Sequence, residues 1–306
     1  MPKTNIKIPS IEEMLEAGVH FGHQMKRRSP YMDKFIYGVD NKSQIIDLYK
    51  TQELLKKSAE FIYDLASQGK QIVIVGTKRQ ASQIVKDMAQ SAGILFVSQR
   101  WLGGTFTNYN SVKSRIDRLD FLIEAKKKGE LDRYTKKERL EFDREVEKLE
   151  DVVGGIRKLK KFPEAMIVVD VKKERVAVRE AKAAKVPVIG IIDTNSDPRD
   201  IKYLVPANDD AIKSIRLVLG VLVEAAIEGY KDQKVESDKP AVAPTVVAKK
   251  PEEKVEVKAK TEKPAAKTTK SAKAEPKTTA KADTDTKPKA KPATAAKEPK
   301  PKAKSK

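Results

Sequence analysis

Five short, unbroken apolar runs constrain the fold of this chain more than any other feature of its sequence. The runs are QIVIV (71–75), ILFV (94–97), MIVVD (166–170), VIGIID (188–193) and YLV (203–205). Stretches with helical spacing lie among them, and a last helix is expected from about 209 to 229. A strand buried on both faces shows no polar alternation, and such strands require helices on both sides of the sheet. The sequence therefore predicts a doubly wound α/β domain around a parallel sheet.

Smaller units are predicted before the first apolar run. Ser10 and Glu13 have the spacing of a capping box, which opens a short helix. Two strands, FIYGV (35–39) and QIIDL (44–48), are expected to pair as a hairpin across the turn DNKS. A helix with one apolar side follows from about 51 to 67.

A long segment between the second and third apolar runs has a different pattern. Its apolar residues recur at spacings of four, three and four in two stripes: Val112, Ile116, Leu119 and Ile123, then Phe142, Val146, Leu149 and Val153. A second capping box, Thr135 with Glu138, lies between the stripes. Two matching stripes around a short turn predict an antiparallel helical hairpin, a small coiled coil inserted at 110–155. Its tip, Lys126–Lys128, is expected to contact either protein or a phosphate backbone.

The last quarter of the chain has a composition that does not support a packed core. From residue 231 onward there is no aromatic residue and no Leu, Ile or Met, while nine of the 16 prolines and 22 lysines lie there. Such a segment cannot bury enough apolar surface to offset the entropy lost on folding. We therefore predict an α/β domain formed by 1–109 and 156–230, the hairpin at 110–155, and a disordered basic tail at 231–306.

Positive charge is in excess in both parts of the chain. Residues 1–230 have 41 basic and 33 acidic residues, a net charge of +8, and the remaining residues add +11. This excess favours a polyanionic partner over a small acidic substrate. For the tail alone, a lysine-rich segment that is merely solvated explains the composition equally well.

Two absences exclude whole classes of protein. The chain has no cysteine, which excludes a disulfide scaffold, a thiolate nucleophile and a cysteine-ligated zinc or iron–sulfur centre. No run approaches the roughly 20 apolar residues of a membrane span, and the N-terminus lacks the apolar core of a signal peptide. We therefore expect a cytoplasmic protein without a membrane partner.

Evidence for catalysis is thin. The chain has no GxxxxGK[ST], GxGxxG or GxSxG motif. The turn at 76–79, GTKR, follows a predicted strand and is either a weak phosphate-binding turn or a solvated first helical turn. Asp170 and Asp193 end two predicted strands at the edge where ligands of such sheets bind. A magnesium- or phosphate-dependent enzyme using these two carboxylates is the alternative to the prediction of a protein with no catalytic residue and no cofactor.

The only two histidines, His20 and His23, lie in the motif GVHFGHQ. Gly18 and Gly22 interrupt any helix there. A metal site normally needs three or four ligands, so carboxylates from Asp193, Asp209 or Asp210 would have to complete one. We predict that the histidines pack and hydrogen-bond rather than bind a metal.

Two basic segments favour nucleic acid as the polyanion. On a helical wheel, Lys172, Arg175, Arg179 and Lys182 lie on one side of the helix predicted after Asp170, with alanines opposite. The segment MKRRSPYMDKF (25–35) mixes basic residues with Tyr31 and Phe35. Cationic side chains bind phosphates, while aromatic rings stack on bases or pack against the domain.

Several strings resemble, in order, the bacterial family of small-ribosomal-subunit protein number two. They are GVHFGHQ, FIYGVDNKSQIIDLYKT, QIVIVGTKRQA, QRWLGGTFTN, VVGGIRKLKKFPEAMIVVD, and VPVIGIIDTNSDP running on to VPANDDAI, within residues 10–230. The resemblance implies a flavodoxin-like α/β domain with an inserted coiled-coil hairpin. It also implies a non-enzymatic protein that binds small-subunit ribosomal RNA near the junction of head and body and joins late in assembly. The tail departs from the family, since many members stop soon after the last helix.

The family's partners, as the resemblance implies them, are ribosomal RNA and other small-subunit proteins. Among the latter is the large mRNA-binding protein, whose docking supports translation initiation. An assembly adaptor, in which the hairpin binds protein and RNA contacts are incidental, is a further alternative. We expect these residues to bind RNA: Lys26, Arg27, Arg28, Lys78, Arg79, Arg100, Asn108, Arg157, Lys158, Arg175 and Arg179.

The string QRWLGGTFTN holds the only tryptophan and leads into the hairpin. Gly103 and Gly104 permit close or left-handed backbone there. We expect Trp101 to anchor the root of the hairpin to the α/β core. Arg100 and Asn108 contact RNA or a partner in the functional interpretation of this loop.

Overall fold

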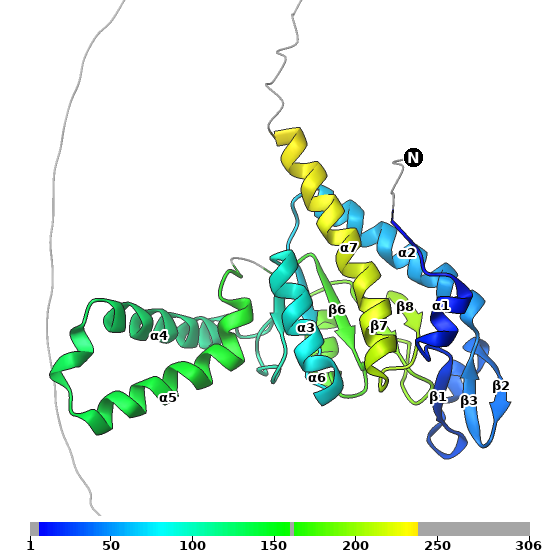
Figure 1. Ribbon diagram of the computed structural model, residues 1–306, viewed down its shortest axis with the longest axis horizontal. Helices are drawn as coiled ribbons and strands as arrows, with labels where there is room; N and C mark the ends of the chain where they lie inside the picture. The colour runs from blue at the N-terminus through cyan, green and yellow to red at the C-terminus, as the bar shows by residue number, and fades with distance from the viewer. Residues whose placement is uncertain (1–5, 160–161, 238–306) are drawn as a thin grey trace, which may run out of the picture. The chain divides into compact units, whose positions relative to one another are not determined.

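A five-stranded parallel sheet forms the centre of the α/β domain (Figure 1). The computed structural model describes residues 6–159 and 162–237. The strands are β4 (Ile72–Val75), β5 (Leu95–Val97), β6 (Ala165–Val169), β7 (Val188–Ile192) and β8 (Tyr203–Pro206). Their order is β5-β4-β6-β7-β8, and every neighbouring pair is parallel. This is the order of flavodoxin-like sheets, so the predicted doubly wound α/β fold is confirmed.

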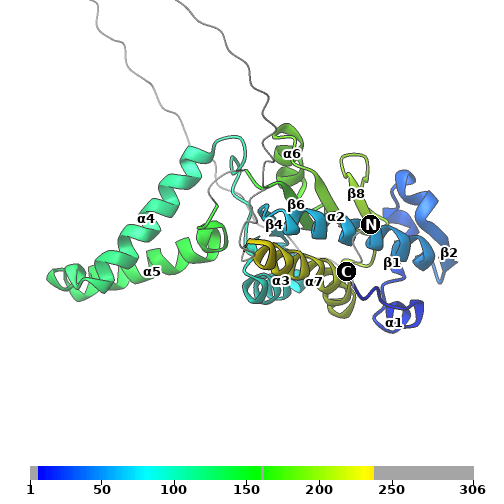
Figure 2. The ribbon, with the colours of Figure 1, turned by 90° about the horizontal axis from the view of Figure 1, so that it is seen from above.

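Helices cover both faces of the sheet because alternate strand residues point to opposite faces. Ile72 and Ile74 belong to a core shared with helices α2 (Leu48–Ser67), α3 (Arg79–Ala92) and α7 (Ile212–Ser237). Val73 and Val75 belong to a second core, shared with α6 (Arg175–Ala183). Figure 2 shows α3 and α7 on one side of the strands and α6 on the other.

A small antiparallel sheet precedes the large one, in the order β1-β3-β2. Its strands are β1 (Phe21–Gln24), β2 (Ile36–Asp40) and β3 (Ser43–Ile46). The predicted hairpin is confirmed, but β3 ends at Ile46 because Asp47 caps α2, accepting a hydrogen bond from the Tyr49 N–H at 3.1 Å. The predicted strand end at 48 and helix start at 51 were therefore wrong. Strand β1 was not predicted.

The first capping box is confirmed at α1 (Ile11–Glu16). The Ser10 hydroxyl accepts from the Glu13 N–H at 3.2 Å, and the Glu13 carboxylate accepts from the Ser10 N–H at 2.8 Å. Helix α1 lies against the core that α2 and α7 share, since Met14 is fully buried there.

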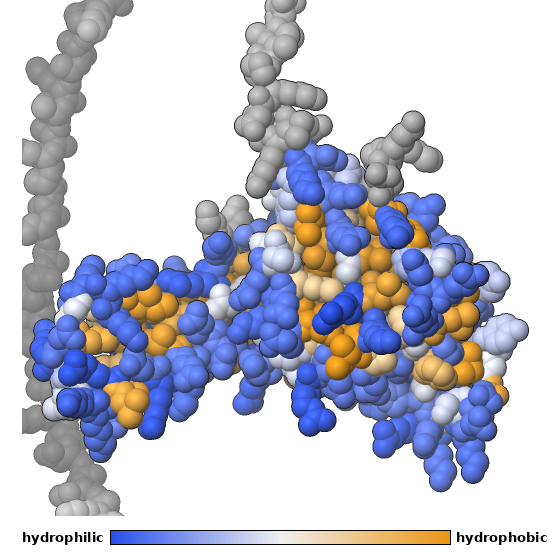
Figure 3. All heavy atoms as spheres, viewed as in Figure 1, coloured by the Kyte–Doolittle hydropathy of each residue, from blue (hydrophilic) through white to orange (hydrophobic). Residues whose placement is uncertain are grey.

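Two helices, α4 (Tyr109–Lys127) and α5 (Lys136–Val153), form the segment between β5 and β6. They contact each other, and a 3-10 turn, η3 (Glu130–Arg133), connects them. Thr135 and Glu138 form the predicted second capping box. Apolar side chains lie between the two helices and charged ones lie outside (Figure 3). The helices are as predicted, while their coiled-coil geometry stays a prediction.

The root of this segment is anchored as the sequence predicted. Trp101 is 8% exposed and meets Phe106 edge to face, with ring centroids 5.1 Å apart. Both rings share a core with Val112 and Ile116 of α4. Gly104 adopts the expected left-handed backbone, with φ of +95°.

Helix α7 continues to Ser237, beyond the end predicted at about 229. Gly229 lies within the helix and does not terminate it. A Cβ at this position would lie 2.6 Å from the Tyr63 carbonyl oxygen of α2, so the close contact requires glycine. The glycine instead permits α2 and α7 to approach closely. The predicted boundary at 230 is therefore wrong for residues 231–237, and the rest of the predicted tail, 238–306, lies outside the described residues. No helix in the described part of the chain has the length and apolar character of a membrane span.

Candidate functional site

An open groove of about 830 Å³ lies between the segment that follows β1 and helix α6. We call it the basic groove, and its cationic lining residues are Lys26, Arg27, Arg28, Lys172, Arg175, Arg179 and Arg199. Five of the eleven predicted RNA-binding residues therefore line one surface, although they come from two segments about 150 positions apart. The sequence predicted both basic segments but not their proximity.

The segment after β1 is fixed in place by two contacts. The Ser29 N–H donates to the Thr194 carbonyl in the loop after β7 at 2.9 Å. Met32, within the 3-10 turn η2 (Pro30–Phe35), is fully buried. These contacts leave Lys26, Arg27 and Arg28 exposed.

Helix α6 turns its acidic residues away from the basic groove. Glu180 is buried and accepts hydrogen bonds from the N–H groups of Gly104 at 2.7 Å and Phe106 at 3.0 Å. Glu174 is buried too and accepts from the Thr77 N–H at 3.0 Å. Sequence reasoning missed both roles, although Glu180 falls beside the buried Ala177 and Ala181 on the helical wheel. The exposed face of α6 keeps its positive charge.

Two carboxylates, Asp197 and Asp200, also line the basic groove. Asp197 pairs with Arg199 at 2.6 Å, and Asp200 pairs with Lys182. Arg28 also has an acidic partner, because its guanidinium forms an ion pair with the Asp33 carboxylate at 2.7 Å. Of the five predicted residues that line the groove, four have no carboxylate within 4.0 Å among the described residues: Lys26, Arg27, Arg175 and Arg179. Their charges are available to a polyanion.

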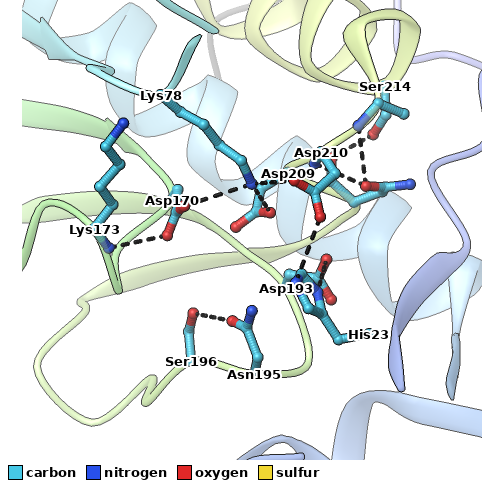
Figure 4. Close-up of polar contacts among 12 residues, drawn as sticks. His23, Lys78, Asp170, Lys173, Asp193, Asn195, Ser196, Asp209, Asp210 and Ser214 are labelled. Carbon is cyan, nitrogen blue, oxygen red and sulfur yellow. Dashed lines mark hydrogen bonds and ion pairs between the residues drawn. The ribbon is translucent and has the colours of Figure 1, made fainter. Parts of the chain in front are cut away.

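A second polar cluster lies at the carboxyl edge of the sheet (Figure 4). Asp170 follows β6, Asp193 follows β7, and Asp209 and Asp210 follow β8. Lys78, at the start of α3, places its ammonium 2.6 Å from both Asp209 and Asp210 and 3.5 Å from Asp170. The predicted edge position of Asp170 and Asp193 is thus confirmed.

His23 joins this cluster from β1. Its Nδ1 lies 2.8 Å from Asp193 Oδ2 and its Nε2 lies 3.4 Å from Asp210 Oδ2. The hydrogen bond with Asp193 raises the pKa of His23, against the effect of burial. His20 is elsewhere, with its ring tilted by 40° against that of Phe21 and the ring centroids 3.9 Å apart. The two histidines therefore do not form a pair.

The cluster contains the donors that the metal-binding alternative required. One ligand atom from each of His23, Asp193, Asp209 and Asp210 lies within 4.8 Å of the others. The Asp209 Oδ2 atom is buried without a hydrogen-bond partner in the described structure. Imidazole and carboxylate donors in this number suit a divalent cation such as zinc. The ammonium of Lys78 shares the same carboxylates, so a cation would compete with it.

Burial raises the pKa of Asp209 to about 7, with further contributions from the charges of Asp170 and Asp193, while Lys78 opposes the shift. A carboxyl that is half protonated near neutral pH reduces the repulsion among the four aspartates. Lys78 and this proton offset part of the negative charge of the cluster.

The turn at 76–79 is not a phosphate-binding turn. The Thr77 N–H that would face an anion donates to Glu174 instead. Lys78 is 12% exposed and surrounded by carboxylates, which would repel a phosphate. The solvated alternative does not describe Lys78 either, and only Arg79 of this turn is exposed.

The remaining predicted residues lie outside the basic groove. Arg100 and Asn108 are exposed in the loop before α4 and at its N-terminus. Arg157 pairs with Asp120 of α4, and Lys158 is exposed beside it. Arg157 and Lys158 line a separate pocket near the root of the α4–α5 segment. The structure brings none of these four together with the basic groove.

Comparisons with known proteins agree closely with one another. A family model described as "Ribosomal protein S2" matches residues 14–229. The "Small ribosomal subunit protein uS2" of Geotalea uraniireducens is 47% identical over 220 residues, 72% of this chain and 86% of that protein. Proteins of the same name from Desulforapulum autotrophicum and Bdellovibrio bacteriovorus are each 45% identical, over 72% and 73% of this chain and 79% and 71% of their own lengths.

Proposed function

Since this chain belongs to the ribosomal protein S2 family, we propose that it binds small-subunit ribosomal RNA through the basic groove. Family members are structural components of the small ribosomal subunit and not enzymes, so the prediction of a non-enzymatic protein is confirmed. The carboxylates at the sheet edge are accordingly structural or ion-binding groups rather than catalytic ones.

The observation that carries this proposal is the convergence of Arg27 and Lys26 with Arg175 and Arg179 across one groove. Phosphate contacts from Lys and Arg supply a large share of the affinity of a protein for nucleic acid. Each guanidinium can hold a phosphate through two parallel hydrogen bonds. The burial of Glu174 and Glu180 keeps the acids of this helical segment out of the groove, so that Asp197 and Asp200 are its only carboxylates among the described residues.

The proposed RNA-binding set differs from the sequence prediction at one residue. Lys78 is left out because its ammonium is already held by three carboxylates. Arg79, Arg100, Asn108, Arg157 and Lys158 are proposed as separate contacts beyond the groove. Arg28 contributes after exchanging Asp33 for a phosphate.

The wider role rests on family resemblance. We propose that the protein supports assembly of the small subunit and docking of the large mRNA-binding ribosomal protein, in the cytoplasm. The 110–155 segment is proposed as an inserted coiled coil, and the segment from 238 onward is proposed to make weak, salt-sensitive RNA contacts.

The test compares a double variant, Arg175→Glu with Arg179→Glu, against a control with the same charge change at exposed lysines outside the groove, Lys56→Glu with Lys213→Glu. Binding to small-subunit ribosomal RNA is measured at several salt concentrations. We expect the groove variant to bind more weakly, with a slope of log K against log salt smaller by about one for each lost phosphate contact. Equal behaviour of the two variants would contradict the proposal.

A further inference from the structure

A second groove, of about 460 Å³, lies next to the basic groove. We call it the aromatic groove. The residues of its lining that carry charge or an aromatic ring are Tyr31, Lys34, Phe35, Lys57, Arg199, Lys202 and Tyr203. Tyr31 and Arg199 line both grooves, so the two surfaces are continuous across this pair.

The charged residues of the aromatic groove are all cationic. Four residues of its lining are basic, and no residue of its lining is acidic. Within the described residues, Lys34 and Lys202 have no carboxylate within 4.0 Å, whereas Lys57 pairs with Glu53 and Arg199 with Asp197. A negatively charged ligand therefore meets two uncompensated ammonium groups here.

Aromatic rings lie close to these cations. The Lys202 ammonium lies 5.6 Å from the centroid of the Tyr203 ring, and Tyr203 stacks on Phe61 with centroids 4.1 Å apart and planes 19° from parallel. The Lys34 ammonium lies 4.9 Å from the Phe35 centroid. The groove thus offers flat apolar surfaces and cations within a few ångströms of each other.

Tyr31 separates the two grooves. Its side chain is 48% exposed although its neighbour Met32 is fully buried. The Arg199 guanidinium lies 4.0 Å from the ring centroid, which covers one face of the ring. Met32 and Arg199 thus fix the position of the Tyr31 ring, while about half of the residue stays exposed to solvent. Another flat group can stack on the exposed part of the ring.

We infer that the aromatic groove binds an unpaired nucleotide of RNA, whose flanking phosphates lie in the basic groove. The inference rests on the proposed function and specifies the kind of RNA that this side of the protein takes. A base in a duplex is stacked on its neighbours, whereas an unpaired base can stack on aromatic rings or a guanidinium. The volume of the groove falls within the roughly 300–1,000 Å³ of small-molecule sites. An acidic peptide would use the cations but would not need rings beside each of them.

The test uses the full chain and two fluorescently labelled RNAs of equal length, a single strand and a duplex, with binding followed by anisotropy. Tyr31→Ala should weaken binding of the single strand about tenfold and leave duplex binding unchanged. Tyr31→Phe should retain the affinity, because the ring rather than the hydroxyl stacks. The matched control is Tyr49→Ala, since Tyr49 is 71% exposed and lines neither groove.

Salt dependence separates stacking from phosphate binding. Tyr31→Ala should leave the slope of log K against log salt unchanged, whereas Lys202→Ala should reduce it. An equal loss on single strand and duplex, or no loss from Tyr31→Ala, would overturn the inference. Polyglutamate binding that is weakened as much by Tyr31→Ala would overturn it in favour of an acidic peptide.

The same measurements distinguish failure of the inference about the aromatic groove from failure of the proposed function. If Arg175→Glu with Arg179→Glu weakens RNA binding while Tyr31→Ala does not, only the inference about the aromatic groove falls. If neither variant weakens RNA binding, the proposed function falls with it.

Discussion

The carboxylate of Glu180 accepts a hydrogen bond from the backbone N–H of Gly104 at 2.7 Å. Its other oxygen accepts from the Phe106 N–H at 3.0 Å. One buried side chain of α6 therefore holds the loop that leads into α4. The helix that supplies arginines to the basic groove also fixes the root of the α4–α5 segment.

Replacing Glu180 by Ala should destabilise the protein, because the buried Phe106 N–H and the part-buried Gly104 N–H lose their acceptor, and a buried donor left without a partner costs about 1–3 kcal/mol. Glu180→Gln should cost less, since one amide oxygen still accepts. Urea unfolding followed by circular dichroism measures both changes. Glu224→Ala, at an exposed glutamate of α7, is the control and should change stability by less than about 0.5 kcal/mol. Equal stability of the Glu180→Ala and Glu224→Ala proteins would refute this role.

Gly22→Ala should destabilise the small sheet. An added Cβ would lie 2.6 Å from Thr194 Cγ2 and 3.0 Å from the Gln44 carbonyl oxygen, and such overpacking costs about 1–3 kcal/mol. Gly38→Ala, in β2 of the same sheet, meets nothing within 4 Å and should be tolerated. Thermal unfolding of the two variants gives the comparison, and similar midpoints would be inconsistent with the close packing of β1 against the loop after β7.

The loss of Lys78 should be costly. Its ammonium compensates Asp170, Asp209 and Asp210, and removing one partner of a buried ion pair costs about 3–5 kcal/mol. Lys78→Met should therefore lower the free energy of unfolding by that order, measured with a chelator present so that no divalent cation replaces the ammonium. Lys56→Met, at an exposed lysine, is the control. A Lys78→Met protein as stable as this control would show that the cluster needs no ammonium.

Stability should depend on pH through Glu174. Burial raises the pKa of Glu174 above its ordinary value of 4.5, and the hydrogen bonds from Thr77 only partly oppose this. The folded state then binds the proton more tightly than the unfolded state, so this group's contribution to stability falls as pH rises above 4.5 towards the raised pKa. Glu174→Gln should remove that part of the slope in urea unfolding measured from acid to neutral pH. An unchanged slope in the variant would mean that other groups cause it.

The large sheet was predictable from the sequence because burial on both faces leaves an unbroken apolar run in each strand. Strand β1 carries no such signal. The four residues FGHQ do not alternate clearly between apolar and polar, and they form a strand because β3 and Thr194 provide partners. Similarly, Gly229 looks like a helix end until the closeness of Tyr63 is known.

The sequence predicted the individual basic residues of the candidate site, but it did not predict that they line one groove. Positive charge at Arg27 and Arg179 was evident, while their common groove depends on the Ser29–Thr194 hydrogen bond and the packing of α6. Lys78 has the same charge and was assigned the same role. Its actual partners, Asp209 and Asp210, lie about 130 positions later, and the sign of a charge does not reveal such neighbours.

The close contact between α2 and α7 has a consequence for the time course of synthesis. Helix α2 is made early, and the glycine that admits it against α7 is made about 170 residues later. At translation rates of about 5–20 residues per second, this interval lasts roughly 10–30 s. Throughout that interval the apolar stripe of α2, with Leu55 and Ile62 at its centre, has no final covering. A nascent chain of this protein therefore leaves this apolar stripe incompletely covered until its last helix has emerged.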